Sequence, residues 1–454
     1  MIALNKAKGK FIVYFFSLAV PIIIQNFLAA SLNLIDNIMV GRLGDISIAG
    51  VGLGNQVFFV LQLFFIGIST GGGLFTAQFL GRNDRDGIKK VLGFTLIVGI
   101  SVSTAYFMVV SHRAEWVISL FTKQPEVIAG GSAYLKIVSW SYPVTAFNLC
   151  SAAVLRSVKR VRQPMTANIS GIITNTFGNY LLIFGHFGMP VMGVRGAAIA
   201  TVIARLVEAS ILLYFMLRKR HTLRHDIAVM FSFKLRLVKR FVSLTSMMII
   251  KDVIWGLGVT FYMAIYGRMG TEIVASFNIV QAIRQLTFVL FQGYAAACLI
   301  IISNLLGANR FKRAHRDVGR ILKITFVTAL FSGTFLILAR PLFMLPYAVS
   351  EAVKLITFNL LLINGILLML QVYDMVIIMG VLRSGGDVRF TLFMDLTAVY
   401  AIGLPIGFIS WKFFGLSIYW VFILINLQEV YKFFLVVSRL KSRKWQRNLV
   451  HDLN

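Results

Sequence analysis

The sequence predicts an all-α polytopic membrane protein with 12 transmembrane helices in two six-helix lobes. Three observations predict this class: the composition, the length of the apolar runs and an internal repeat. Of the 454 residues, 58% are hydrophobic and only 14% are charged, which is far from the balance of a soluble globular protein. Runs of about 20 apolar residues, the length that crosses a bilayer, recur along the whole chain.

Twelve apolar runs are long enough to span the membrane, and some exceed one span, so tilt is expected. No long polar insertion separates them, and no extramembrane domain is expected. The predicted spans are 14–40, 48–80, 91–110, 127–155, 165–184, 191–217, 241–266, 273–305, 321–339, 352–382, 390–410 and 415–437.

Basic residues between the spans predict the orientation. With both termini in the cytoplasm, the inside segments hold 31 of the 45 Lys and Arg, and the outside loops hold six. This bias follows the positive-inside rule and predicts a multi-pass protein of the cell inner (cytoplasmic) membrane. The formal net charge of +28 is explained by these loops, so no nucleic-acid partner is expected.

Short motifs of the first half of the chain return in the second half at a nearly constant spacing. Gly41–Gly44 (GRLG) returns as Gly267–Gly270 (GRMG), and Leu155–Ser157 (LRS) returns as Leu382–Ser384. Six spans lie between equivalent points, an even number, so both halves cross the membrane in the same sense. The sequence therefore predicts two lobes related by a parallel pseudo-twofold repeat, a plan typical of transporters.

The repeat predicts the domain boundaries. We expect an N-terminal six-helix lobe at 1–220, a cytoplasmic basic linker at 221–240 and a C-terminal six-helix lobe at 241–454.

The first span overlaps the stretch Pro21–Gly44, which carries Asp36 at membrane depth. An ionisable group there costs several kcal/mol unless it is paired, hydrated or neutralised by a proton. Pro21 removes one intrahelical hydrogen bond and favours a bend. A carboxylate on a bendable membrane helix predicts a gated ion site; the alternative is a structural aspartate held by neighbouring amides.

Counting residues places more polar groups at the depth of Asp36. Asp36 lies about 6 Å below the outer end of its span, at the rise of about 1.5 Å per residue. Asn175 and Asn179 lie one turn apart on a later span, and Thr201 lies on the next, in the same outer layer. One carboxylate with amide and hydroxyl oxygens suits a proton or a hard cation such as Na⁺. We predict an ion-coupling site at these four residues.

Two other carboxylates within the spans, Glu208 and Glu429, have local partners. Arg205 and Glu208 lie three residues apart, as do Glu429 and Lys432, so each pair can neutralise itself on one helix face. Asp36 has only amides as neighbours, which makes it the candidate titrating group.

No pattern indicates an enzyme. The six His residues lie in loops or the tail, and His221 and His225 have metal-ligand spacing without the glutamate of an HExxH motif. No GxxxxGK[ST] phosphate loop occurs, and no nucleophile–base pair is evident at membrane depth. We expect no enzymatic activity and no cofactor apart from a coupling ion.

Four segments together resemble one transporter family. They are Pro21–Gly44, Ala152–Met165 (AAVLRSVKRVRQPM), Gly193–Thr201 (GVRGAAIAT) and Gly380–Phe390 (GVLRSGGDVRF). In order and spacing they resemble the multidrug and toxic compound extrusion (MATE) transporters over nearly the whole chain. The resemblance implies two lobes around a central cavity, with alternating access driven by inward H⁺ or Na⁺.

The resemblance also implies site residues. In one prokaryotic branch the N-lobe holds a helix 1 Asp, an Asn and an Asp four residues apart on helix 5, and a Thr on helix 6. Asp36, Asn175 and Thr201 match these positions, whereas Asn179 stands where that branch has Asp. Pro21 matches the proline at which helix 1 of the family bends.

The other branch uses C-lobe carboxylates, a helix 7 Glu and a helix 10 Asp. Asp252 and Asp374 lie on comparable helices and are the secondary candidates.

The function implied is an ion-coupled (H⁺ or Na⁺) antiporter that exports amphipathic organic compounds, cations above all. We expect a monomer whose only other partners are membrane lipids. The alternative, a flippase for a lipid-linked precursor from the same superfamily, is favoured by four basic residues within spans and disfavoured by 12 rather than 14 helices. These basic residues are Lys136, Lys251, Arg284 and Lys323.

Overall fold

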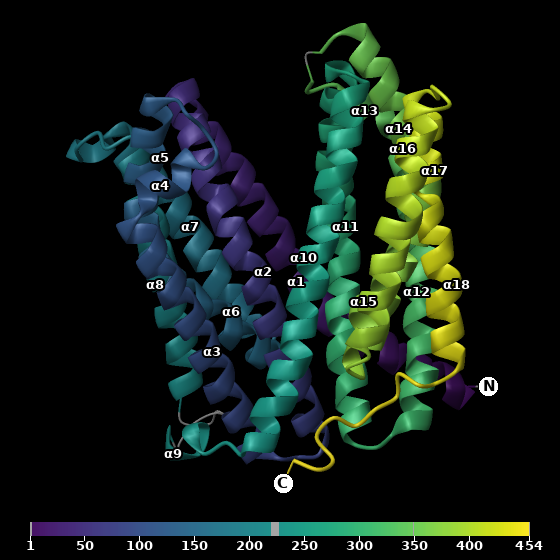
Figure 1. Cartoon of the computed structure of the whole chain (residues 1–454). Coiled ribbons are helices and arrows are strands. Elements are labelled where there is room, and N and C mark those ends of the chain that lie inside the picture. Colours follow the sequence, from purple (N-terminus) through teal and green to yellow (C-terminus); the bar gives the residue numbers. More distant parts are fainter. Residues whose placement is uncertain (1, 219–226, 348, 454) are drawn as a thin grey trace. The chain divides into compact units, whose positions relative to one another are not determined.

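The computed structural model describes residues 2–218, 227–347 and 349–453, and every regular element in these ranges is helical (Figure 1). The absence of strands from the described ranges agrees with the all-α class. The predicted linker, 221–240, lies partly outside these ranges, as do its two histidines, His221 and His225.

The chain divides into two compact units by its contacts. Val20–Thr245 form the N-terminal unit, and Ser246–Asp452 form the C-terminal unit together with the first residues of the chain as far as Ala19. The chain therefore passes from one unit to the other within its first helix, next to Pro21. The lobe boundaries at 220 and 241 stay predictions.

The N-terminal unit contains the following helices, in chain order. They are the second part of α1 (Ile2–Gly41), α2 (Asp45–Gly81), α3 (Arg85–His112), α4 (Ala114–Ser119), α5 (Pro125–Val138), α6 (Ser141–Ser157), α7 (Arg162–Phe184), the short turn η1 (His186–Gly188), α8 (Val194–Leu217), α9 (Ile227–Phe231) and the start of α10 (Leu235–Met269).

The C-terminal unit contains the rest of α10 and a second helical series. This series comprises α11 (Thr271–Gly307), α12 (Phe311–Leu338), α13 (Arg340–Met344), α14 (Glu351–Met375), the π-helical η2 (Val376–Leu382), α15 (Val388–Leu396), the π-helical η3 (Thr397–Gly403), α16 (Leu404–Lys412), α17 (Ile418–Ile425) and α18 (Leu427–Lys441).

The internal repeat is visible in the helices themselves. Both α2 and α11 have 37 residues, and both α3 and α12 have 28. In each pair, the first residues of the two helices are as far apart in the sequence as Gly41 and Gly267. Gly44 before α2 and Gly270 before α11 both have positive φ, at 95° and 144°. A side chain is strained there, which explains why the repeated motif ends in glycine.

Ten helices within the described residues are long and apolar enough to cross a membrane. The remaining two predicted spans correspond to α7 and to the pair α5 and α6. Within the predicted span at 127–155 the regular helix is interrupted at Ser139 and Trp140, between α5 and α6. Pro143 has no N–H to bond the carbonyl of Ser139 four residues earlier, which interrupts the helix there.

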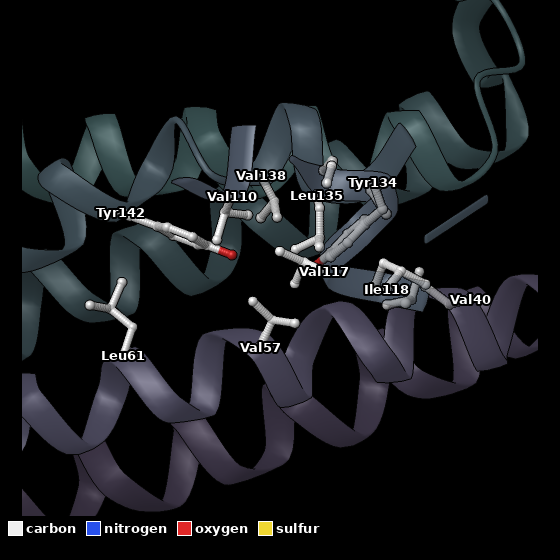
Figure 2. Packing of buried hydrophobic residues seen from close by; sticks show 14 of the residues in the cluster. Val40, Val57, Leu61, Val110, Val117, Ile118, Tyr134, Leu135, Val138 and Tyr142 are labelled. Atoms are coloured by element: carbon white, nitrogen blue, oxygen red, sulfur yellow. The ribbon is translucent and has the colours of Figure 1, made fainter. Parts of the chain in front are cut away.

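The core of the N-terminal unit is a continuous apolar cluster. Val57 and Leu61 of α2 face Leu135 of α5 and Tyr142 of α6 (Figure 2). Helices α2 and α5 approach so closely at Gly50 that a Cβ there would lie only 2.9 Å from the backbone of α5. This packing fixes the scaffold on which the polar groups of the unit are placed.

Candidate functional site

Asp36 lies in the last quarter of α1 and is partly buried. Asn179 of α7 donates a hydrogen bond from Nδ2 to Asp36 Oδ1 at 2.7 Å. Among the described residues, no Lys or Arg forms an ion pair with this carboxylate. Its charge is therefore balanced by dipoles rather than by a bonded cation, as expected for a group that exchanges an ion.

Asn175 and Asn179 project from the same face of α7, and both are buried. Asn179 Nδ2 also lies 3.3 Å from Asn175 Oδ1, and Asn175 Nδ2 lies 3.2 Å from Thr201 Oγ1 on α8. The structure thus brings Asp36, Asn175, Asn179 and Thr201 into one connected polar cluster. Their role in ion coupling stays a prediction.

The Asn175 amide fits the cluster in one of its two orientations. With its oxygen and nitrogen exchanged, Nδ2 donates to both oxygens of Asp36, at 3.0 and 3.2 Å, and the amide oxygen accepts from Thr201 Oγ1. In that orientation the amide donates to both oxygens of the ionised carboxylate and accepts from the hydroxyl, so each group meets a partner of the right kind.

One amide oxygen of the cluster is left over. Asn179 Oδ1 is buried and has no hydrogen-bond partner among the described residues. A buried oxygen without a partner costs about 1–3 kcal/mol, unless a cation or water binds it. With the Asp36 carboxylate and the Thr201 hydroxyl, it forms a donor set of hard oxygens that fits Na⁺ as well as a proton relay.

The cluster forms because α7 and α8 pack at very short range. A Cβ added at Gly178 would lie 3.0 Å from Ala200, and one at Gly171 would lie 3.3 Å from the backbone of Ala204. Small residues at these positions let the two helices approach until Asn175 meets Thr201.

Pro21, the predicted gating residue, lies inside α1, which stays continuous through it. Four residues later, Gln25 accepts a hydrogen bond from Arg156 Nη1 of α6 at 3.4 Å. Sequence reasoning missed this contact, which joins residues 131 positions apart. Whether α1 bends at Pro21 during transport stays a prediction.

The secondary candidates occupy a different environment in the C-terminal unit. Asp252 lies 3.4 Å from both Lys251 Nζ and Arg383 Nη2, so it is paired with cations. Asp374 is 1% exposed, and neither of its oxygens has a hydrogen-bond partner among the described residues. No hydrogen bond between described atoms joins Asp374 to Asp252.

Further ion pairs surround these carboxylates. Lys251 contacts Asp395 at 3.0 Å, and Lys432 contacts Glu429 at 2.9 Å and approaches Asp395 at 4.0 Å. The pairing of Lys432 with Glu429 is as predicted. The polar centre of this unit is thus a charged network, unlike the mostly neutral cluster around Asp36.

Comparison with known proteins shows which family the chain belongs to. The model of the MatE family matches residues 21–181 and 248–409. The starts of these two stretches are as far apart in the sequence as the two copies of the Leu-Arg-Ser motif. The uncharacterized transporter YisQ of Bacillus subtilis is 26% identical over 439 residues, covering 95% of this chain and 94% of that protein. The probable multidrug resistance protein NorM of Thermotoga maritima is 24% identical over 437 residues, covering 95% and 93%.

Solved structures share the fold. An outward-facing multidrug resistance MATE family transporter superposes with a TM-score of 0.86 at 19% identity, covering 95% of this chain and 96% of that one. A MATE structure in the bent conformation gives 0.86 at 20% identity, covering 96% and 97%. The two-lobe, 12-helix membrane fold is therefore shared. Because the family model matches well over half of its length, this multi-pass membrane protein belongs to the MatE family of transporters.

Proposed function

We propose that the protein is an antiporter coupled to H⁺ or Na⁺ that exports amphipathic organic compounds, cations above all. The observation that carries the proposal is the Asp36 carboxylate, held at membrane depth by Asn179 with no ion pair to a described cation. Its relatives NorM and MdtK are named as multidrug resistance proteins. The protein would act as a monomer in the cell inner membrane, with both termini in the cytoplasm.

In the proposed cycle, Asp36 is ionised while the transporter holds its substrate. An ion that enters from outside neutralises Asp36, α1 changes its course near Pro21, and the affinity for the substrate falls. An ion can drive this change only if it binds the two states with different affinities, so the carboxylate is indispensable to coupling.

The test is transport by purified protein in proteoliposomes with an imposed pH or Na⁺ gradient, with ethidium as the substrate. Asp36→Asn keeps the size of the side chain and one acceptor oxygen but removes its charge, and should reduce gradient-driven transport to the level of protein-free liposomes. Wild-type rates from Asp36→Asn would overturn the proposal. Loss of coupling in Asp374→Asn alone would assign it to the C-terminal unit.

The flippase alternative has less support from the basic residues that suggested it. Lys136 pairs with Glu115 at 2.9 Å, and Lys251 pairs with Asp395 at 3.0 Å, so neither offers an unpaired charge to a pyrophosphate. Binding of an undecaprenyl-pyrophosphate analogue, with no binding of organic cations, would reverse this ranking.

A further inference from the structure

A second charged group of the N-terminal unit lies along the same helix face as Thr201. Arg205 follows Thr201 by four residues on α8 and Glu208 follows it by seven, so the three side chains share one face. Arg205 Nη1 lies 2.9 Å from Glu208 Oε2. At the helical rise of about 1.5 Å per residue, Arg205 is about 6 Å and Glu208 about 10 Å from the level of Thr201.

The pair is built into the packing of the unit. The Glu208 side chain is only 6% exposed, and Asn168 of α7 donates to its other oxygen, Oε1, at 3.4 Å. Asn148 of α6 donates to the backbone carbonyl of Arg205 at 3.0 Å. Helix α8 is therefore held at this point from two sides, and the ion pair cannot shift along it freely.

The order of the two charged side chains along α8 determines the effect of the pair on Asp36. Thr201 contacts Asn175, which in turn contacts the Asp36 carboxylate. Arg205 is attached to α8 one turn from Thr201, and Glu208 is attached about two turns from it. The ion pair has no net charge, yet its positive end is nearer to the ion site. A pair that merely neutralised two buried charges would serve equally well in the reverse order.

Other groups near the two acids are neutral or act on only one of them. Around Asp36 these are Asn175, Asn179 and the Tyr134 phenol of α5. Around Glu208 they are Asn168 and the Arg156 guanidinium of α6. Among the described residues, Arg205 is thus the cation that forms an ion pair with Glu208 and is attached to α8 one turn from Thr201, on the side chain network of Asp36.

We propose that the Arg205–Glu208 pair sets the affinity of the Asp36 site for its coupling ion. Arg205 opposes the binding of a cation at Asp36, and Glu208 limits this opposition by holding the guanidinium and cancelling part of its field. The ion is then bound weakly enough to be released on the cytoplasmic side. This inference rests on the proposed function and deepens it by naming the residues that tune the site.

The test measures the external H⁺ or Na⁺ concentration that gives half-maximal ethidium transport in proteoliposomes. Arg205→Gln should lower this concentration by roughly tenfold, the low end for a neighbouring charge because the Arg205 side chain is 34% exposed. Glu208→Gln should raise it several-fold, because the freed guanidinium then acts on Asp36 alone. The two single variants should therefore shift in opposite directions.

The double variant Arg205→Gln with Glu208→Gln guards against misfolding, because it leaves no unpaired charge buried. Its shift should have the sign of the Arg205 variant and a smaller size. The matched control is Lys136→Gln with Glu115→Gln, an ion pair of the same unit at 2.9 Å whose side chains are 50% and 68% exposed, and it should shift nothing.

No shift in any Arg205 or Glu208 variant, or shifts of both single variants in one direction, would overturn the inference. Asp36→Asn measured in the same series distinguishes failure of the proposed function from failure of this inference. If it transports like the wild type, the proposed function fails. If it loses coupling while the Arg205 and Glu208 variants stay at the wild-type half-maximal concentration, only the inference fails.

Discussion

The two units follow one helical plan but hold different groups at equivalent positions. At the spacing of the repeat, Asp36 corresponds to Tyr262. Asp36 accepts a hydrogen bond from Asn179 at 2.7 Å, whereas the Tyr262 hydroxyl donates to Gln428 Oε1 at 2.9 Å. A phenol stays neutral near pH 7, so the C-terminal position carries no charge to exchange. If Asp36 binds the coupling ion as proposed, this capacity depends on the residue at the position and not on the repeated backbone.

The first helices of the two units are also held differently. Arg156 of the Leu-Arg-Ser motif donates to the neutral Gln25 on α1, and its repeat counterpart Arg383 lies 3.4 Å from the Asp252 carboxylate on α10. Charge-assisted contacts are roughly twice as strong as neutral ones. Pro21 has no proline counterpart in α10. At this position α1 is thus held by a weaker contact than α10.

The largest expected effect breaks the charged network of the C-terminal unit. Lys251→Met removes the cation that contacts Asp395 and Asp252, and should destabilise the protein by about 3–5 kcal/mol in thermal unfolding in detergent. Lys354→Met is the control, because its pair with Glu351 is exposed and should contribute no more than about 1 kcal/mol. Equal melting temperatures for Lys251→Met and the wild type would contradict the account.

The next effect tests whether the counterpart of Asp36 is purely structural. Tyr262→Phe leaves Gln428 Oε1 without its donor and should cost about 1–3 kcal/mol of stability. The ion dependence of transport should not change. A shifted ion dependence in this variant would show that the C-terminal position takes part in coupling.

A third change adds charge to the N-terminal cluster. Asn179→Asp places a second carboxylate beside Asp36 and should lower the half-maximal ion concentration by roughly tenfold, because two carboxylates bind a shared cation more tightly than one. The measurement is transport over a series of Na⁺ and H⁺ concentrations. An unchanged or higher half-maximal concentration would mean that Asn179 does not face the bound ion.

The smallest effect concerns the contact that holds α1. Gln25→Ala removes one long hydrogen bond to Arg156 and should change stability by no more than about 1 kcal/mol. Gln25→Glu, which imitates the ionic contact of the C-terminal unit, should slow the exchange of ion and substrate because it holds α1 more tightly. Stopped-flow fluorescence measures the rate of this exchange for both variants. Faster exchange by Gln25→Glu than by the wild type would contradict this role of the contact.

Much of the fold could be predicted because helix length, apolar runs and the constant spacing of the repeated motifs can be read directly from the sequence. That Asp36, Asn175 and Thr201 lie at one level could be predicted from residue counts, since helical rise is constant. The break before Pro143 was missed because its apolar flanks read as one continuous span.

Contacts between distant segments could not be predicted in the same way. Equal depth does not say which helices are neighbours, and the close packing of α7 and α8 depends on Gly171 and Gly178 meeting particular partners. The hydrogen bond between Gln25 and Arg156, and the one between Tyr262 and Gln428, became visible only when side chains were placed in space.

The most direct measurement is the affinity of the purified protein for ethidium over a range of pH and Na⁺ concentration. Ion and substrate affect each other reciprocally if they are coupled. The account predicts that the wild-type Kd rises as the coupling ion is added and that the Kd of Asp36→Asn does not respond. A Kd of Asp36→Asn that follows the ion as in the wild type would contradict it.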